Sequence, residues 1–194
     1  MAAYDPKIHH RRSLRYPGFD YSAKGHYFVT FATRNLERLF GQIDKGKIVL
    51  NEFGQIAEEE WLRTAEIRQS LELDSYVIMP NHIHGIIIIK LKGDPAQGKA
   101  LSRTGEPAGR PGIDPDRHLS LSDLDNIDSF GLKSGTIGAI LGQYKSIVSK
   151  RINARRGTAG KQIWHRNYFE RIIRDEEELK RIRKYIENNP LEWR

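Results

Sequence analysis

The stretch from His82 to Ile89 (His-Ile-His-Gly-Ile-Ile-Ile-Ile) limits the possible folds more than any other part of the sequence. Isoleucines at successive positions fill both faces of a strand, which is typical of a fully buried strand in the middle of a sheet. Alternate side chains of a strand point the same way, about 6.5–7 Å apart, so we expect His82 and His84 on one face and Ile83 on the other. Such a pair can hold one metal ion or one phosphate, but two polar residues at the end of a strand are the commoner explanation of an isolated pair.

Segments with strand character and segments with helical periodicity alternate on either side of this stretch. The tight turn at Pro80-Asn81 predicts an antiparallel hairpin between the strands that it joins. Asn51 and Asp175 are the predicted N-caps of the first and last helices, and Pro190 ends the last helix. The pattern predicts strands at 26–33, 73–79, 82–91 and 164–173, helices at 52–70, 137–152 and 175–189, and a loop or short hairpin at 40–50.

This order of elements predicts an α+β domain on the split βαβ plan, which is ferredoxin-like or RRM-like. In that plan an antiparallel sheet carries helices on one face and leaves the other face open, as a platform for single-stranded nucleic acid. Here the plan would be extended by a C-terminal helix. We expect a single domain over residues 1–194, with a basic N-terminal arm at 1–24 and a flexible insertion rich in Gly, Pro and Ser at 92–134.

The bulk composition favours a polyanionic partner, because the chain has 32 Lys and Arg against 25 Asp and Glu, a formal net charge of +7. No stretch approaches the about 18 consecutive apolar residues of a membrane span, and residues 1–15 lack the apolar core of a secretory signal. The absence of cysteine excludes disulfides, thiolate metal sites and cysteine nucleophiles. We therefore expect a cytoplasmic, nucleoid-associated protein with no membrane partner.

Tyr185 and Asn189, in the last predicted helix, are the other candidate site residues. At about 100° per residue, Tyr185 lies about 60° from the buried Ile182, and Asn189 is a near neighbour of Tyr185 one turn later. Both can therefore face the sheet rather than solvent. Tyrosine is a competent covalent nucleophile when a metal or a base assists it, although a tyrosine at the edge of the core is the usual explanation for any single one.

Four segments of the chain, in order, resemble the REP-associated tyrosine transposases, a branch of the single-tyrosine transposases of hairpin-ended insertion sequences. The stretch Pro80-Asn81-His82-Ile83-His84 resembles their His-hydrophobe-His (HUH) motif, and Tyr185-Ile186-Glu187-Asn188-Asn189-Pro190 resembles their nucleophile helix. Arg11-Arg12-Ser13 with Tyr27-Phe28-Val29-Thr30 resembles their opening segment, and Ile-Trp-His-Arg-Asn-Tyr-Phe-Glu at 163–170 resembles the segment before the last helix. The resemblance covers nearly the whole chain apart from 92–134.

The resemblance implies a transposase that cleaves and rejoins single-stranded DNA at hairpin, REP-like sequences. Tyr185 would form a 5′-phosphotyrosine and release a 3′-OH, and a later attack by a 3′-OH would reverse that step without water. His82, His84 and Asn189 would bind Mg²⁺ or Mn²⁺, which would polarise the scissile phosphodiester. The family implies a monomer or a homodimer.

Basic residues predict salt-dependent contacts with the phosphates of the DNA. The N-terminal arm is the best candidate for contacts specific to a sequence or a hairpin. The candidate DNA-binding residues are Arg11, Arg12, Arg15, Arg151, Arg155, Arg156, Lys161, Arg166, Arg183 and Lys184.

Two other functions are kept open by the sequence. A non-catalytic module on the same fold would stack single-stranded nucleic acid on Tyr27, Phe28 and Phe31, but it would not require both the histidine pair and Tyr185. A metallohydrolase would use the two histidines as zinc ligands, but such sites need further His or Asp ligands close by.

Overall fold

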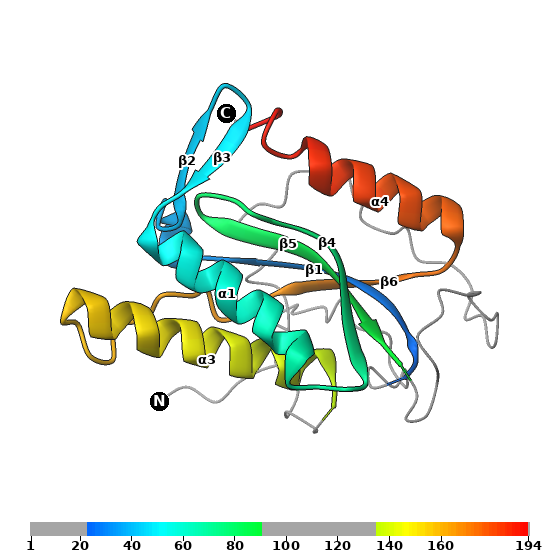
Figure 1. Cartoon of the computed structure of the whole chain (residues 1–194), viewed down its shortest axis with the longest axis horizontal. Coiled ribbons are helices and arrows are strands. Elements are labelled where there is room, and N and C mark those ends of the chain that lie inside the picture. The colour runs from blue at the N-terminus through cyan, green and yellow to red at the C-terminus, as the bar shows by residue number, and fades with distance from the viewer. Residues whose placement is uncertain (1–22, 91–134, 194) are drawn as a thin grey trace, which may run out of the picture.

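The computed structural model describes residues 23–90 and 135–193, which form a four-stranded antiparallel sheet, a separate two-stranded hairpin and three long helices (Figure 1). Residues 1–22 of the predicted arm and all of the predicted insertion at 92–134 lie outside the described residues. No helix in the described part of the chain is long and apolar enough to cross a membrane. The elements are β1 (Gly25–Ala32), η1 (Arg34–Leu36), β2 (Gly41–Asp44), β3 (Lys47–Leu50), α1 (Glu52–Glu66), β4 (Leu71–Ile78), β5 (His82–Ile89), α3 (Ile137–Arg156), β6 (Phe169–Ile173) and α4 (Glu176–Asn188).

The sheet has the strand order β4-β5-β1-β6, with every neighbouring pair antiparallel. This is the order of a split βαβ domain, so the predicted α+β fold class is confirmed. The strand β5 lies between β4 and β1, and all of its residues except Ile88 are buried. The isoleucine-rich stretch is therefore a central strand, as the sequence predicts.

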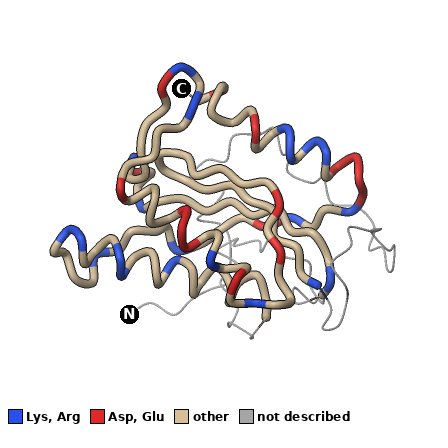
Figure 2. The backbone as a smooth tube through the Cα atoms, viewed as in Figure 1, with Lys and Arg blue, Asp and Glu red and all other residues tan. Residues whose placement is uncertain are grey.

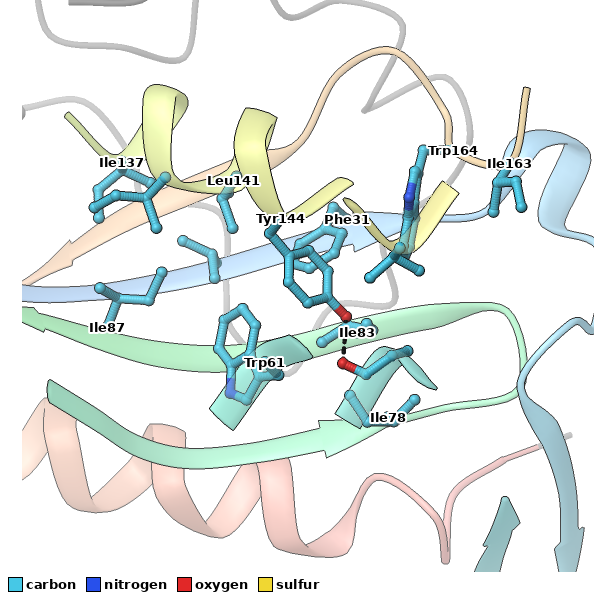
Figure 3. Close-up of a cluster of buried hydrophobic side chains, with 14 of the residues drawn as sticks. Phe31, Trp61, Ile78, Ile83, Ile87, Ile137, Leu141, Tyr144, Ile163 and Trp164 are labelled. Atoms are coloured by element: carbon cyan, nitrogen blue, oxygen red, sulfur yellow. Dashed lines mark hydrogen bonds between the residues drawn. The ribbon is translucent and has the colours of Figure 1, made fainter. Parts of the chain in front are cut away.

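The side chains of the sheet form two cores, one on each face. On the first face, Phe31, Ile83 and Ile87 pack against α1 and α3 (Figure 3). There the Tyr144 hydroxyl of α3 donates a hydrogen bond of 2.8 Å to the carbonyl of Ala57 in α1, and so ties the two helices together. The residues of the second core that the sheet and α4 provide are Phe28, Ala32, Val77, Ile86, Phe169, Ile173, Leu179, Ile182 and Ile186.

The expectation of an open sheet face is wrong, because α4 covers the face opposite to α1 and α3 (Figure 1). The apolar stripe of α4 needs a partner, and the second face of the sheet is the apolar surface that it buries. The aromatic side chains proposed for base stacking are buried as well: Tyr27, Phe28 and Phe31 are at most 2% exposed. A platform of these three rings is therefore not available to nucleic acid.

Local hydrogen bonds set the ends of the elements. The Asn51 side chain accepts bonds from the first turn of α1, and the Asp175 side chain accepts one of 2.7 Å from the Glu178 amide, so both predicted N-caps are confirmed. The strand β6 begins at Phe169 rather than at 164. Trp164 forms only an isolated antiparallel bridge with Thr33, and the Lys145 ammonium donates to the carbonyls of His165 and Asn167 in the segment between this bridge and β6.

The ends of α1 and α4 and the segment 40–50 lie close to their predicted positions. The helix α1 ends at Glu66, earlier than the predicted residue 70. The helix α4 ends at Asn188, and Asn189 is its C-cap with helical dihedral angles. The segment 40–50 is a hairpin, whose turn residues Lys45 and Gly46 both have a positive φ, as a two-residue hairpin turn requires.

One ion pair joins the middle of α4 to the edge strand β4. The Arg183 guanidinium donates to both carboxylate oxygens of Asp74, at 3.0 Å from Nε and 2.5 Å from Nη2. Burial raises the pKa of the Asp74 carboxyl, but the bonds from Arg183 and Ser75 lower it by more, so this pKa lies below its usual value. The pair fixes the lateral position of α4 on the sheet.

We expect Gly85→Ala to lower the free energy of unfolding by about 1–3 kcal/mol, the usual cost of overpacking. A Cβ at Gly85 would lie 2.4 Å from the Trp61 ring, which fills the space above this strand residue. Urea denaturation measures the change. The added cost of Gly85→Ala should be smaller in a Trp61→Phe background, and an equal cost in both backgrounds would show that the clash with the indole is not its cause.

We expect Asp74→Asn to lower the free energy of unfolding at pH 7 by about 1 kcal/mol. A carboxylate whose pKa is lowered by folding stabilises the protein above its unfolded pKa and loses this contribution as the pH falls through its folded pKa. The difference between wild type and variant should therefore shrink below the usual pKa of 3.8. Glu72→Gln, at a more exposed carboxylate that pairs with Lys90, is the control and should change stability less. A difference that does not vary with pH would contradict this role of Asp74.

Candidate active site

The two histidines of β5 point to the face of the sheet that α4 covers, and both are buried. Their Nε2 atoms lie 3.0 Å apart, with the ring planes at 75° to each other. Each ring is held from behind at Nδ1: His82 by the Asn81 side-chain oxygen at 2.7 Å, and His84 by the Thr30 hydroxyl at 2.7 Å. The alternation of a strand thus places the pair as the sequence predicts, and hydrogen bonds fix both rings.

Tyr185 approaches this pair from α4. Its hydroxyl lies 3.3 Å from His84 Nε2, although the two residues are 101 positions apart in the sequence. The Phe28 ring stands edge-on to the Tyr185 ring at 6.1 Å and limits its movement. The structure therefore brings a phenol and two imidazoles to one point, as expected for these three residues.

Asn189, the third predicted ligand, is buried at the C-cap of α4, four residues after Tyr185. In the described part of the chain, no group of three or more His, Cys, Asp and Glu side chains could hold a metal ion. The two Nε2 atoms, 3.0 Å apart, converge closely enough for both imidazoles to bind one ion, and oxygen ligands with water would complete a site that suits Mn²⁺ or Mg²⁺. These side chains do not supply the further His or Asp ligands that a zinc hydrolase needs.

Trp193 and Arg38 also lie at this site, and neither is among the residues selected from the sequence. The Trp193 ring lies over His82 with 5.7 Å between the ring centroids, and the Arg38 guanidinium lies 5.5 Å from the centre of the Trp193 ring. Arg38 is exposed and Trp193 is half-buried. Only the position of Trp193, eight residues after Tyr185, could have suggested from the sequence that Trp193 lies near the site. Nothing in the sequence around Arg38, in the segment after η1, suggests that Arg38 lies there.

Those candidate DNA-binding residues that the structure describes in α3 and α4 lie on opposite sides of the sheet, which separates the two helices (Figure 2). Several of them pair with carboxylates: Arg151 with Glu59 and Glu60, Arg156 with Glu37, and Arg183 with Asp74. Arg155, Lys161, Arg166 and Lys184 are exposed, and only Lys184 of these four belongs to α4. Arg11, Arg12 and Arg15 lie outside the described residues.

The known proteins to which the chain is similar include a sequence relative and two solved structures. No protein-family profile matches the chain. A REP-associated tyrosine transposase solved with a REP hairpin is 18% identical, with a TM-score of 0.45 over 98% of this chain and 73% of that one. A Deinococcus radiodurans protein described as a candidate transposase is 16% identical, with a TM-score of 0.41 over 88% of this chain and 93% of that one. At these scores the likeness carries no weight for fold or activity.

The sequence relative is an uncharacterized protein of Haemophilus influenzae. It is 35% identical over 192 residues, which span 98% of this chain and 93% of that protein. Identity at this level over nearly the full length of both chains shows common descent. The chain therefore belongs to the same family as this Haemophilus influenzae protein.

Proposed function

We propose that the protein is a tyrosine transposase that cleaves and rejoins single-stranded DNA beside hairpin, REP-like sequences. One observation carries the proposal: the Tyr185 hydroxyl lies 3.3 Å from His84 Nε2, which itself lies 3.0 Å from His82 Nε2. Binding alone does not require a phenol beside two converging imidazoles, whereas a tyrosine nucleophile needs a base or metal ligands beside it. The order of the motifs along the sequence supports the same assignment.

Tyr185 acts as the nucleophile in this proposal. Its oxygen forms a bond to the phosphorus of the scissile phosphodiester, and the bond from phosphorus to the 3′ oxygen of the DNA breaks. The phenolic proton is lost and the 3′ oxygen gains a proton, so that one phosphodiester replaces another. A 3′-OH can later attack the 5′-phosphotyrosine and restore a DNA strand, with neither water nor a nucleotide cofactor.

His82, His84 and Asn189 are the residues that would hold Mg²⁺ or Mn²⁺, and such an ion polarises a phosphodiester when bound. The packing of the chain positions the nucleophile. The edge-on contact with Phe28 orients the Tyr185 ring, and the helix α4 holds its hydroxyl against His84. Because Tyr185 meets the histidines of its own chain, one protomer contains all the proposed catalytic groups.

Single-stranded DNA would enter on the α4 side of the sheet, where Arg38, Trp193 and Lys184 lie. Aromatic rings stack on bases irrespective of sequence, and exposed cations attract the phosphates. The contact of the Trp193 ring with His82 supports a base-stacking role for Trp193 beside the proposed metal site. In this role Trp193 takes the place of Tyr27, Phe28 and Phe31, whose burial removes the main support for a non-catalytic binding module.

We expect the wild-type protein to form a covalent adduct with a hairpin-bearing single-stranded oligonucleotide in the presence of Mn²⁺ or Mg²⁺, because Tyr185 would be joined to DNA. The adduct resists denaturation and migrates slowly on a denaturing gel. Tyr185→Phe should abolish it, since only the attacking oxygen is removed. Tyr76→Phe, a half-buried tyrosine of β4 whose hydroxyl donates to Glu58, is the matched control and should retain the adduct. An adduct that persists in Tyr185→Phe would exclude Tyr185 as the nucleophile.

We expect Arg38→Ala to weaken binding of the same oligonucleotide and to reduce the salt dependence of the affinity by about one phosphate contact. Fluorescence anisotropy at several salt concentrations measures both quantities. Arg155→Ala removes an exposed arginine of α3 on the other side of the sheet, and it should change the affinity little. The opposite ranking of the two variants would place the DNA on the α3 side.

A further inference from the structure

We propose that the β2–β3 hairpin is a DNA-binding arm, which holds a single-stranded segment of the substrate just outside the active site. This role rests on the proposed function, because it takes single-stranded DNA as the substrate and names a surface that binds it beside the nucleophile. Three features of the hairpin carry the proposal: the contact of its tip with the C-terminal segment, the exposed cations of the tip, and a lysine in a strained backbone conformation.

The hairpin is fixed to the side of the molecule that holds the candidate active site. It projects beyond the end of the sheet, and its Ile43 packs against the second core (Figure 1). At the tip, Gly46 lies so close to Leu191 that a Cβ added to the glycine would be 2.6 Å from Leu191 Cδ2. Two residues further along the chain, the Trp193 ring contacts His82. A short C-terminal segment therefore connects the tip of the hairpin to the proposed metal site.

The tip, residues 44–47, offers with Leu191 the two kinds of group that bind unpaired nucleotides. Lys45 and Lys47 are exposed, and neither forms an ion pair within the part of the chain that the structure describes (Figure 2). The tip contains one carboxylate, that of Asp44, so a net positive charge remains for phosphates. Leu191 is 68% exposed and presents an apolar surface beside these cations. Cations for the backbone next to a surface for base faces are typical of a single-strand site, whereas a duplex keeps its base faces stacked inside.

Lys45 has a backbone conformation that is unfavourable for lysine. Its φ is +49°, in the left-handed region, where a two-residue hairpin turn ordinarily has Asn, Asp or Gly. The turn itself does not require a lysine, because asparagine tolerates the same conformation with less strain. Strained residues of this kind are concentrated at functional sites. We therefore attribute the lysine at this position to its charge.

Substitutions at the tip separate the charge from the geometry of the turn. Lys45→Asn should raise the urea midpoint of unfolding, because the strain is relieved, and yet weaken DNA binding, because a cation is lost. Lys47→Gln removes the second cation outside the two central turn positions. The probe is an unstructured thymidine oligonucleotide, whose binding requires no recognition of a DNA hairpin.

Fluorescence anisotropy at several salt concentrations measures the affinity for this probe. Each phosphate contact on a single strand contributes about 0.7 to the slope of log K against log salt concentration, so the double variant Lys45→Asn/Lys47→Gln should lose about 1.4. Leu191→Ser should weaken binding without a change in slope, because an apolar contact with a base releases no counterion.

The matched control is the double variant Arg63→Gln/Lys150→Gln. It removes two exposed cations from α1 and α3, on the other side of the sheet, and lowers the net charge by the same amount. Its slope should stay near that of the wild type. On a blunt DNA duplex the two double variants should behave alike.

Three results would overturn the proposal. The first is a wild-type protein that does not bind the thymidine oligonucleotide, and the second is a hairpin double variant with the slope of the wild type. The third is a loss on the blunt duplex that is specific to the hairpin variant, since this would assign the arm to double-stranded DNA.

These measurements concern binding alone, and they can be made in a Tyr185→Phe background in which the proposed reaction does not occur. If the slopes change as expected but the wild-type protein forms no covalent adduct, the transposase assignment is wrong and the arm is supported. If the adduct forms but the hairpin variant binds like the wild type, the arm is wrong and the activity is supported.

Discussion

The packing of α4 on the second face of the sheet is the interaction on which the proposed site depends. Leu179, Ile182 and Ile186 are buried there against Phe28 and neighbouring strand residues. Each buried aliphatic side chain contributes about 1.5–3 kcal/mol, whereas a partly exposed ion pair such as that of Arg183 contributes about 1 kcal/mol or less. Apolar burial therefore holds the helix on the sheet, and the ion pair with Asp74 sets its position. Without this packing Tyr185 would not reach His84.

The same packing puts polar groups into a covered space, where unpaired groups are costly. The buried histidines have hydrogen-bond partners on both sides. Thr30 and Asn81 provide them from the strand and the turn beside the histidines, and Tyr185 provides one from the helix. The site is therefore assembled from a rigid sheet and one docked helix, which suits a reaction that depends on the placement of a phosphodiester. The cover over His82 comes from Trp193, at the end of the chain.

The sequence predicts those features that follow from local periodicity. A period of two places His82 and His84 on one face, and the apolar stripe with Asp175 before it defines α4. Local periodicity does not determine on which of the two apolar faces of the sheet α4 packs. The expectation that one face stays open is therefore wrong. The pairing of Arg151 with Glu59 and Glu60, the contact of Arg38 with Trp193 and the division of the basic residues by the sheet depend in the same way on where distant segments meet.

The central claim is that Tyr185 becomes joined to the 5′ end of a cleaved DNA strand. Tandem mass spectrometry of a digested adduct, formed with an oligonucleotide labelled at its 3′ end, tests it most directly. The account predicts a labelled DNA fragment attached through a 5′ phosphate to the peptide that contains Tyr185. Attachment to another residue, or through a 3′ phosphate, would contradict it.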